Sequence, residues 1–600
     1  MKTNNIYSKN YLKYRILFFL TIFFVVLFLF NNVQNVNANN VTITNVVCQN
    51  PGEANPQISF YLSWNNSWRT GSIAPFNYDA VWIFIKTQYV PNTAINCETT
   101  NPWTHALMNS TTNKDTIGYP LQFSLPLPSD RMGIFVQRSV DGTGNIQSTR
   151  VSLFLEQALG TPTPGSFNFK VFAIEMVFVP TGTFSVGDGA STQTFPATSI
   201  NSATAQPSTG GGALALYDCG YLPSSISTTY PNGYTQFYSM KYEISQQQYV
   251  EFLNTLTYNQ QASRTAIPPN TTATVNGMFA MYTNAGTPIQ GNVTCSNRNS
   301  IKLIQSGILA TGTPAVYGCD YQNAPGDAFN SSGDGKNISM NYLSYDDLLA
   351  YLDWAALRPM TNLEFEKICR GAGVAAVAQE SAVGVSVAVA PAAANALSVS
   401  GAGTSSEISF PTVANASGLF AYGAVATNGP MRVGFAATNS TTRVGAGAAY
   451  YGSMDMSGNV WEMVVGGWNP TYYQSAGVGV GRGYKLTAAN NGDGALTAAG
   501  DQNVTNWQNT PWTGGVDNNF NSGYNHCTGI NYWYFEFRGG AFTSAASTLR
   551  VSDRSTNSIN VCGYYCYSSD ANHQSASYGY GNTGTQTRPS TAGGRGVRTY

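Results

Sequence analysis

An eight-residue stretch from Asp455 to Glu462 constrains the fold most, because it places an acidic residue at each end of a turn that contains Gly458 and Asn459. Two carboxylates and inward-facing backbone carbonyls are the hard oxygen ligands that calcium takes. The same residues also suit a buried turn in which Trp461 is core and Glu462 accepts from a backbone amide. Spacing alone favours the buried turn and leaves the metal site open.

The N-terminus has the features of a secretory signal. Four basic residues precede an uncharged apolar run over residues 16–30, and Val36-Asn37-Ala38 then supplies a small-residue cleavage site. The run is short for a spanning helix, which needs about 20 residues. We therefore expect residues 1–38 to be a signal peptide, and the protein to be secreted to the extracellular side or the cell surface. An uncleaved membrane anchor is the alternative, and this segment is the only predicted membrane contact.

The length and the low charge narrow the class of protein. Six hundred residues predict two or more domains. Charged residues make up only 10% of the chain and its net charge is -1, without a basic cluster in the body, which argues against nucleic acid as a partner. Surfaces rich in hydroxyl and amide groups favour other copies of the chain, or an extracellular protein or glycan, as partners.

Residues 39–165 have the pattern of a small β-sandwich followed by a linker. Residues 80–85 form an apolar run of strand length, which is typical of a central strand. Residues 132–136 and 151–155 flank a turn that begins at Asp141, and this arrangement predicts a hairpin. Several short strands without helices predict the sandwich.

The nine cysteines permit disulfides outside the cytosol, and their odd number leaves at least one thiol or an intermolecular bond. Cys48 and Cys97 are candidates for a disulfide within the first domain. Zinc is not expected, because the cysteine spacing is irregular and the chain has only three histidines.

Residues 166–600 predict a second domain of short strands and a few helices. Ser245 precedes Gln248, and Thr361 precedes Glu364, at the spacing of a capping box that starts a helix. Ser344 and Asp347 show the same spacing before another apolar stripe. Residues 254–340 and 372–418 lack such signals, and we expect them to be loop-rich insertions.

The order of these segments resembles the formylglycine-generating enzyme, or sulfatase-modifying factor, family. The matching segments are residues 176–187 (MVFVPTGTFSVG), 240–253 (MKYEISQQQYVEFL), 341–371, 455–462 (DMSGNVWE), 537–540 (FRGG), 549–554 (LRVSDR) and 594–598 (GRGVR). The resemblance implies an α+β domain with much irregular structure, a variant of the C-type lectin fold, placed after the N-terminal β-sandwich.

The resemblance changes the interpretation of the first motif. In this family the equivalent turn is a structural calcium site, with one side chain, two backbone carbonyls and a terminal glutamate as ligands. Carried over to this sequence, the calcium ligands would be Asp455, Gly458, Val460 and Glu462.

The resemblance does not extend to the catalytic cysteines. The family's enzymes bind copper(I) with two cysteines that have four residues between them, shortly after the Arg-Gly-Gly strand, and soft thiolates suit that ion. Residues 541–550 here contain no cysteine. Cys562 and Cys566 come later and are one residue closer together. They could form a local disulfide, two longer bridges, or a displaced copper-dependent oxidoreductase site, so the sequence leans against an enzyme without excluding one.

The favoured hypothesis is a non-catalytic cell-surface protein that binds a ligand or assembles with itself into a surface layer or fibre. Tyrosine offers a large, rigid contact area with a polar tip, as in antibody paratopes. The same tyrosines could instead pack the irregular fold. The candidate ligand-binding residues near the C-terminus are Tyr564, Tyr565, Tyr567, Tyr578 and Tyr580.

Overall fold

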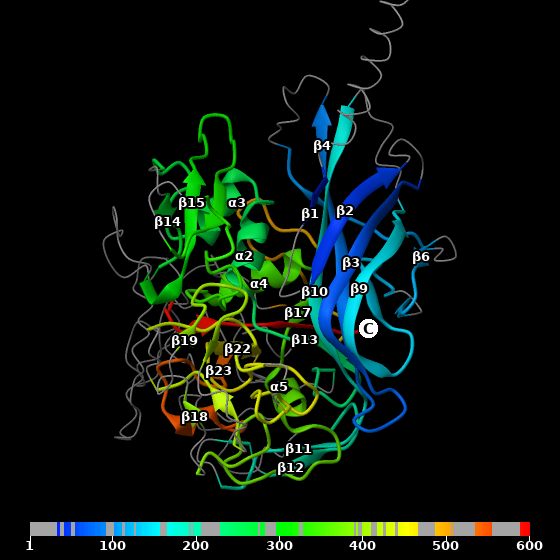
Figure 1. Ribbon diagram of the computed structural model, residues 1–600, viewed down its shortest axis with the longest axis vertical. Coiled ribbons are helices and arrows are strands. Elements are labelled where there is room, and N and C mark those ends of the chain that lie inside the picture. The colour runs from blue at the N-terminus through cyan, green and yellow to red at the C-terminus, as the bar shows by residue number, and fades with distance from the viewer. Residues whose placement is uncertain are drawn as a thin grey trace, which may run out of the picture.

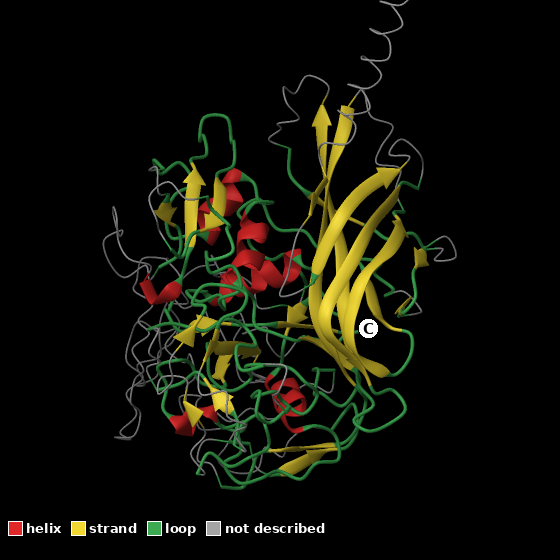
Figure 2. Ribbon diagram, viewed as in Figure 1, coloured by secondary structure: helices red, strands yellow, loops and turns green. Residues whose placement is uncertain are grey.

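The fold consists mainly of strands and loops with few helices (Figures 1 and 2). It is seen in a computed structural model of the chain, and none of the helices in the described part is long and apolar enough to cross a membrane. The structure describes residues 33–35, 41–49, 55–91, 101–110, 115–124, 128–156, 165–190, 194–195, 197–205, 229–273, 277–282, 296–322, 328–388, 392–393, 399–409, 417–423, 428–437, 442–465, 486–505, 507, 535–554 and 588–600.

Two sheets pack face to face in the N-terminal part. The first sheet has the order β2-β3-β9-β6, and its strands are Thr42–Gln49, Gln57–Arg69, Gly142–Phe154 and Thr116–Ile117. The second includes β10, β4, β8, β7 and β5, which are Gly165–Val179, Asp79–Pro91, Ile134–Arg138, Leu121–Phe123 and Thr104–Ala106. Phe60 of β3 and Ile83 of β4 are fully buried between the sheets.

The predicted hairpin around Asp141 is wrong. Strand β8 pairs with β4 and β7, whereas β9 pairs with β3 and β6, so the chain crosses from one sheet to the other at this turn. Asp141 instead accepts from the backbone N–H groups of Gly71 and Ser72, at 2.9 Å each, and so joins two loops. A short connection with turn residues fits both arrangements, which is why the local pattern was misleading.

Strand β10 links the sandwich to the rest of the chain. Its residues 165–177 pair with β4, and Met176 to Val179 pair with β13 (Phe237–Met240). The sheet continues through β25 (Gly596–Arg598) to β17 (Arg358–Pro359). One sheet therefore crosses residue 165, where the sequence suggested a boundary. Strand β1 (Val33–Asn35), inside the predicted signal peptide, pairs in parallel with β10.

In the described part of the chain, four α-helices begin at capping boxes. They are α2 (Gln246–Leu253), α3 (Tyr258–Arg264), α4 (Tyr345–Trp354) and α5 (Asn362–Arg370). The predicted caps Ser245, Ser344 and Thr361 are confirmed, because each side chain accepts from the backbone three residues on and the return bond is also made. Thr257 caps α3 in the same way, inside a segment expected to be loop-rich.

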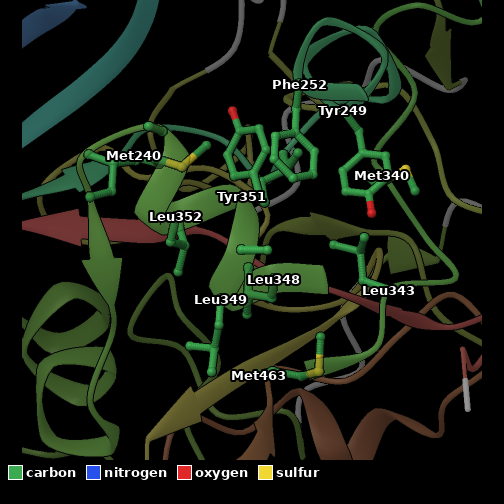
Figure 3. Packing of buried hydrophobic residues seen from close by; sticks show 14 of the residues in the cluster. Met240, Tyr249, Phe252, Met340, Leu343, Leu348, Leu349, Tyr351, Leu352 and Met463 are labelled. Carbon is green, nitrogen blue, oxygen red and sulfur yellow. The ribbon is translucent and has the colours of Figure 1, made fainter. Parts of the chain in front are cut away.

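Helix α4 lies at the centre of the main core (Figure 3). Leu348 and Leu352 are fully buried, and Tyr351 packs against Phe252 of α2 with ring centroids 5.8 Å apart. At the end of α4, Trp354 meets the ring of Phe172 of β10 at 4.8 Å. One face of the second sheet therefore packs into the core of the helices, while its other face packs into a separate core between the two sheets.

Shorter strands and two 3-10 turns complete the described fold. The remaining elements are β11 (Phe184–Val186), β12 (Thr198–Ile200), β14 (Met278–Phe279), η2 (Ser296–Arg298), β15 (Ile301–Gln305), β16 (Val316–Cys319), β18 (Ala392–Ala393), β19 (Val399–Ser400), β20 (Ile408–Ser409), β21 (Leu419–Phe420), β22 (Trp461–Val465), β23 (Phe535–Arg538), η5 (Ala546–Leu549) and β24 (Ala592–Gly593).

Candidate functional site

The turn of residues 455–460 leads into β22, which lies between β23 and β24 in a three-stranded sheet. Asp455, Gly458 and Asn459 all have positive φ angles, of 61°, 85° and 68°. A Cβ atom on Gly458 would lie 2.5 Å from the carbonyl oxygen of Ala421, so glycine is required there. The backbone makes a tight turn, as both interpretations of the sequence demanded.

The aromatic residue of the motif is core. Trp461 is 7% exposed, and its ring lies 6.1 Å from that of Phe537 in the neighbouring strand. Its backbone N–H donates to the carbonyl of Thr591 at 2.8 Å, which ties the motif to the C-terminal segment. Burial of Trp461 therefore agrees with the simpler interpretation of the motif.

Glu462 binds an arginine. Its carboxylate accepts from Nε and Nη2 of Arg595 at 2.8 and 2.7 Å, and both side chains are buried. Arg595 also donates to the carbonyls of Met240, Lys241 and Met454, at 3.1, 3.2 and 2.7 Å. The guanidinium thus holds Glu462 to two other segments of the chain.

Two further carboxylates lie close to this pair and have protein donors of their own. Asp455 accepts from the N–H of Gly434 at 2.5 Å, and burial raises the pKa of Asp455 to about 6. Glu243 accepts from the hydroxyl of Ser339 at 2.5 Å and from the side-chain amide of Asn459 at 2.6 Å. Burial, together with the neighbouring carboxylates, raises the pKa of Glu243 well above its ordinary value.

The four predicted calcium ligands lie together, yet their donor set does not fit calcium as it stands. Calcium takes six to eight oxygen ligands. Both oxygens of Glu462, the terminal carboxylate of the predicted set, are engaged by Arg595. Within the described ranges, no group of three or more acidic, histidine or cysteine side chains is arranged for a metal ion. Calcium at Asp455, Gly458, Val460 and Glu462 stays a prediction.

The segment after the Arg-Gly-Gly strand is a turn of small, hydroxyl and apolar residues, of which Thr543, Ala545 and Ser547 are exposed. Gly539 and Gly540 both have positive φ angles, and the N–H of Ala541 then donates to the hydroxyl of Ser544 at 2.9 Å. Phe542 and Leu549 are fully buried on either side of this turn. The turn contains no thiol, in agreement with its sequence.

Buried ion pairs connect the end of β23, which precedes this turn, to helix α5. Glu366 of α5 binds Arg538 at 3.1 Å and Arg370 at 2.9 Å, with all three side chains fully buried. Arg538 also lies over the ring of Phe365 at 4.9 Å. These buried ion pairs fix the position of the strand, although Nε of Arg538 is buried without a hydrogen-bond partner.

The described cysteines are free thiols and are poor candidates for thiolate chemistry. They are Cys48, Cys319 and Cys369. Burial raises the pKa of Cys48 and of Cys319 to about 12, and it raises that of Cys369 as well. A raised pKa keeps the thiol protonated, whereas nucleophiles and metal ligands are thiolates.

Several predicted site residues lie outside the described residues. They are Cys97, Cys562, Cys566, Tyr564, Tyr565, Tyr567, Tyr578 and Tyr580. The proposed disulfides and the tyrosine ligand surface therefore stay predictions. Sequence reasoning also missed Arg595 as the partner of Glu462, because the two residues are 133 positions apart and share no local pattern.

The comparison with protein families agrees with the segment order. A model of the sulfatase-modifying factor enzyme 1-like domain matches residues 168–561. The match begins inside β10 and includes the turn before β22, Arg538 and the segment that follows it. A search of curated proteins finds no match.

Proposed function

Because the chain belongs to the sulfatase-modifying factor enzyme 1-like family, we propose that it is a secreted, non-catalytic member with a C-type-lectin-like domain. At the cell surface it would either assemble with copies of itself or bind an extracellular ligand. The observation that carries the proposal is the turn between Gly540 and Leu549, which follows the Arg-Gly-Gly strand and contains no thiol.

A buried contact between described residues of the two insertions supports a contact function. Arg298 belongs to the first insertion and Glu407 to the second, and these buried side chains form an ion pair. Arg432 of the adjoining segment donates its backbone N–H to Glu407 at 2.8 Å. Segments held to one another in this way present a fixed surface, which lowers the entropic cost of binding.

Exposed apolar side chains support self-assembly in particular. Ile308 and Leu309, at the β15–β16 loop, are 53% and 62% exposed, and Ile73 and Phe76, at the β3–β4 loop, are 71% and 54% exposed. The two loops lie far apart in Figure 1, at the upper left and the lower right. Contacts between different surfaces of identical subunits produce rings or open filaments.

Electron microscopy and light scattering test the assembly. We expect purified protein to form oligomers or fibres, and the Ile308→Ser, Leu309→Ser double variant to weaken them. Tyr119→Ser is the matched control, because Tyr119 is 80% exposed on another loop. If the wild type stays a monodisperse monomer at high concentration, self-assembly is ruled out and ligand binding is left as the function.

The enzyme alternative has its own test. The purified protein is supplied with copper(I) and a cysteine-containing peptide, and oxygen consumption is followed. We expect no peptide-dependent consumption, and no difference between wild type and the Cys562→Ser, Cys566→Ser variant. Consumption that this variant abolishes would show a displaced redox site and would contradict the proposal.

A further inference from the structure

The guanidinium of Arg595 has five contacts at hydrogen-bonding distance. Two reach the carboxylate of Glu462, and three reach the backbone carbonyls of Met240, Lys241 and Met454, all between 2.7 and 3.2 Å. Arg595 itself is fully buried. One carboxylate and three backbone carbonyls around a buried cation are the ligand types of a calcium site, occupied here by a side chain.

The segments that Arg595 joins come from distant parts of the chain. Met240 ends β13, Met454 immediately precedes the turn, and Glu462 lies in β22. The guanidinium therefore crosslinks the large sheet, the turn and the small sheet at one point. A bound metal ion in this position would make the same kind of crosslink.

The two remaining carboxylates of the cluster already accept hydrogen bonds from protein donors. The carboxylate of Glu243 accepts from three groups, Ser339, Asn459 and the N–H of Val460. Asp455 is engaged by the N–H of Gly434. For calcium to bind Glu462, it would have to displace a guanidinium that is hydrogen-bonded on every side.

We propose that Arg595 is a built-in cation that replaces calcium at this turn, so that the fold of this family member does not depend on calcium. Removal of the side chain would leave Glu462 and the three carbonyls without a cation, in a position where calcium could bind. The proposal does not depend on the proposed contact function, because it concerns only how the turn is held.

The experiment measures the melting temperature of the purified full chain with excess calcium and with a calcium chelator. We expect the two melting temperatures of the wild type to agree. We expect Arg595→Ala to melt lower in chelator and to recover part of the loss in calcium, because only the variant has an open cation site. Direct calcium titration by calorimetry should show binding to the variant at this site and none to the wild type.

Arg358→Ala is the matched control. Arg358 is also buried and forms a two-contact pair with Glu364, at 2.9 and 2.6 Å. We expect Arg358→Ala to melt lower than wild type and to show no response to calcium. A calcium response in both variants would point to general stabilisation by the ion and would overturn the proposal.

Two other outcomes overturn it. The first is calcium binding by wild-type protein that Glu462→Gln abolishes. The second is a folded Arg595→Ala protein that ignores calcium. If Arg595→Ala yields no folded protein in chelator, refolding in calcium replaces the melting test. If neither condition gives folded variant, the melting temperature of the wild type is the test. A drop on chelation refutes the proposal, and an unchanged value supports it.

Discussion

Arg298 and Glu407 form a buried ion pair that joins the two insertions of the domain. Nη1 of Arg298 lies 3.1 Å from Oε1 of Glu407, and Nη2 contacts the other carboxylate oxygen. Glu407 also accepts from the N–H groups of Gly403 and Arg432, at 2.8 Å each. The carboxylate therefore organises both insertions and the segment that follows them.

Arg298→Ala should loosen the two insertions together. The substitution leaves Glu407 buried without its cation, and removal of one partner of a buried pair costs about 3–5 kcal/mol. Hydrogen exchange should become faster over residues 296–322 and 401–409 in the same variant. Arg69→Ala is the control, because the Arg69–Asp141 pair is partly exposed at 3.4 Å. Faster exchange in the first insertion alone would contradict the coupling.

Lys86 should make the stability of the sandwich interface depend on pH. Its ammonium donates to the carbonyl of Gly494 at 2.6 Å, and burial lowers the pKa of Lys86 to about 7, against the opposing effect of Asp353 and Asp493. The unfolded chain keeps this proton up to about its ordinary pKa of 10.5. Between pH 7 and 10.5 the unfolded chain binds more protons than the folded protein does. The free energy of unfolding therefore rises with pH in this range.

The comparison is between wild type and Lys86→Met in chemical denaturation at pH 7 to 10. The free energy of unfolding of the wild type should rise relative to that of the variant, by up to about 1.4 kcal/mol per pH unit. Parallel curves for the two proteins would show that Lys86 keeps its ordinary pKa in the folded state.

Gly371 and Gly373 both resist substitution by alanine, and Gly371 should resist it more strongly. Both have positive φ angles, of 88° and 71°. A Cβ atom at Gly371 would lie 2.2 Å from the ring of Tyr450, whereas a Cβ atom at Gly373 would meet no atom within 4 Å. Gly373→Ala should cost about 1–2 kcal/mol from the left-handed backbone alone. Gly371→Ala should cost about 1–3 kcal/mol more, because it overpacks the site and because Gly371, with ψ of 165°, has a backbone conformation that is almost restricted to glycine. Equal losses in thermal unfolding would show that Tyr450 moves away freely.

The sequence predicted features whose cause is local. Ser245 and Thr361 cap helices because their partners are three residues away, and Trp461 is buried behind a turn that its neighbours define. The contact between Glu462 and Arg595 could not be predicted in this way, because 133 residues separate the two. The pairing of β10 with both β4 and β13 depends on long-range register, which periodicity does not encode.

Arg538 should be irreplaceable by lysine. Its guanidinium binds Glu366 at 3.1 Å, contacts the side chain of Asn362 and the carbonyl of Val551, and lies over the ring of Phe365. The planar guanidinium of arginine can contact all these partners simultaneously, whereas lysine has a single ammonium group at the end of a flexible side chain.

Arg538→Met should therefore lower the free energy of unfolding by about 3–5 kcal/mol, because Glu366 loses one of its two buried cations. Arg538→Lys should recover only part of that loss. A double-mutant cycle with Glu366→Gln, measured by chemical denaturation, should give a coupling energy of about 0.5–3 kcal/mol. If Arg538→Lys has the same free energy of unfolding as the wild type, the positive charge alone stabilises the strand and the planar geometry of the guanidinium is unimportant.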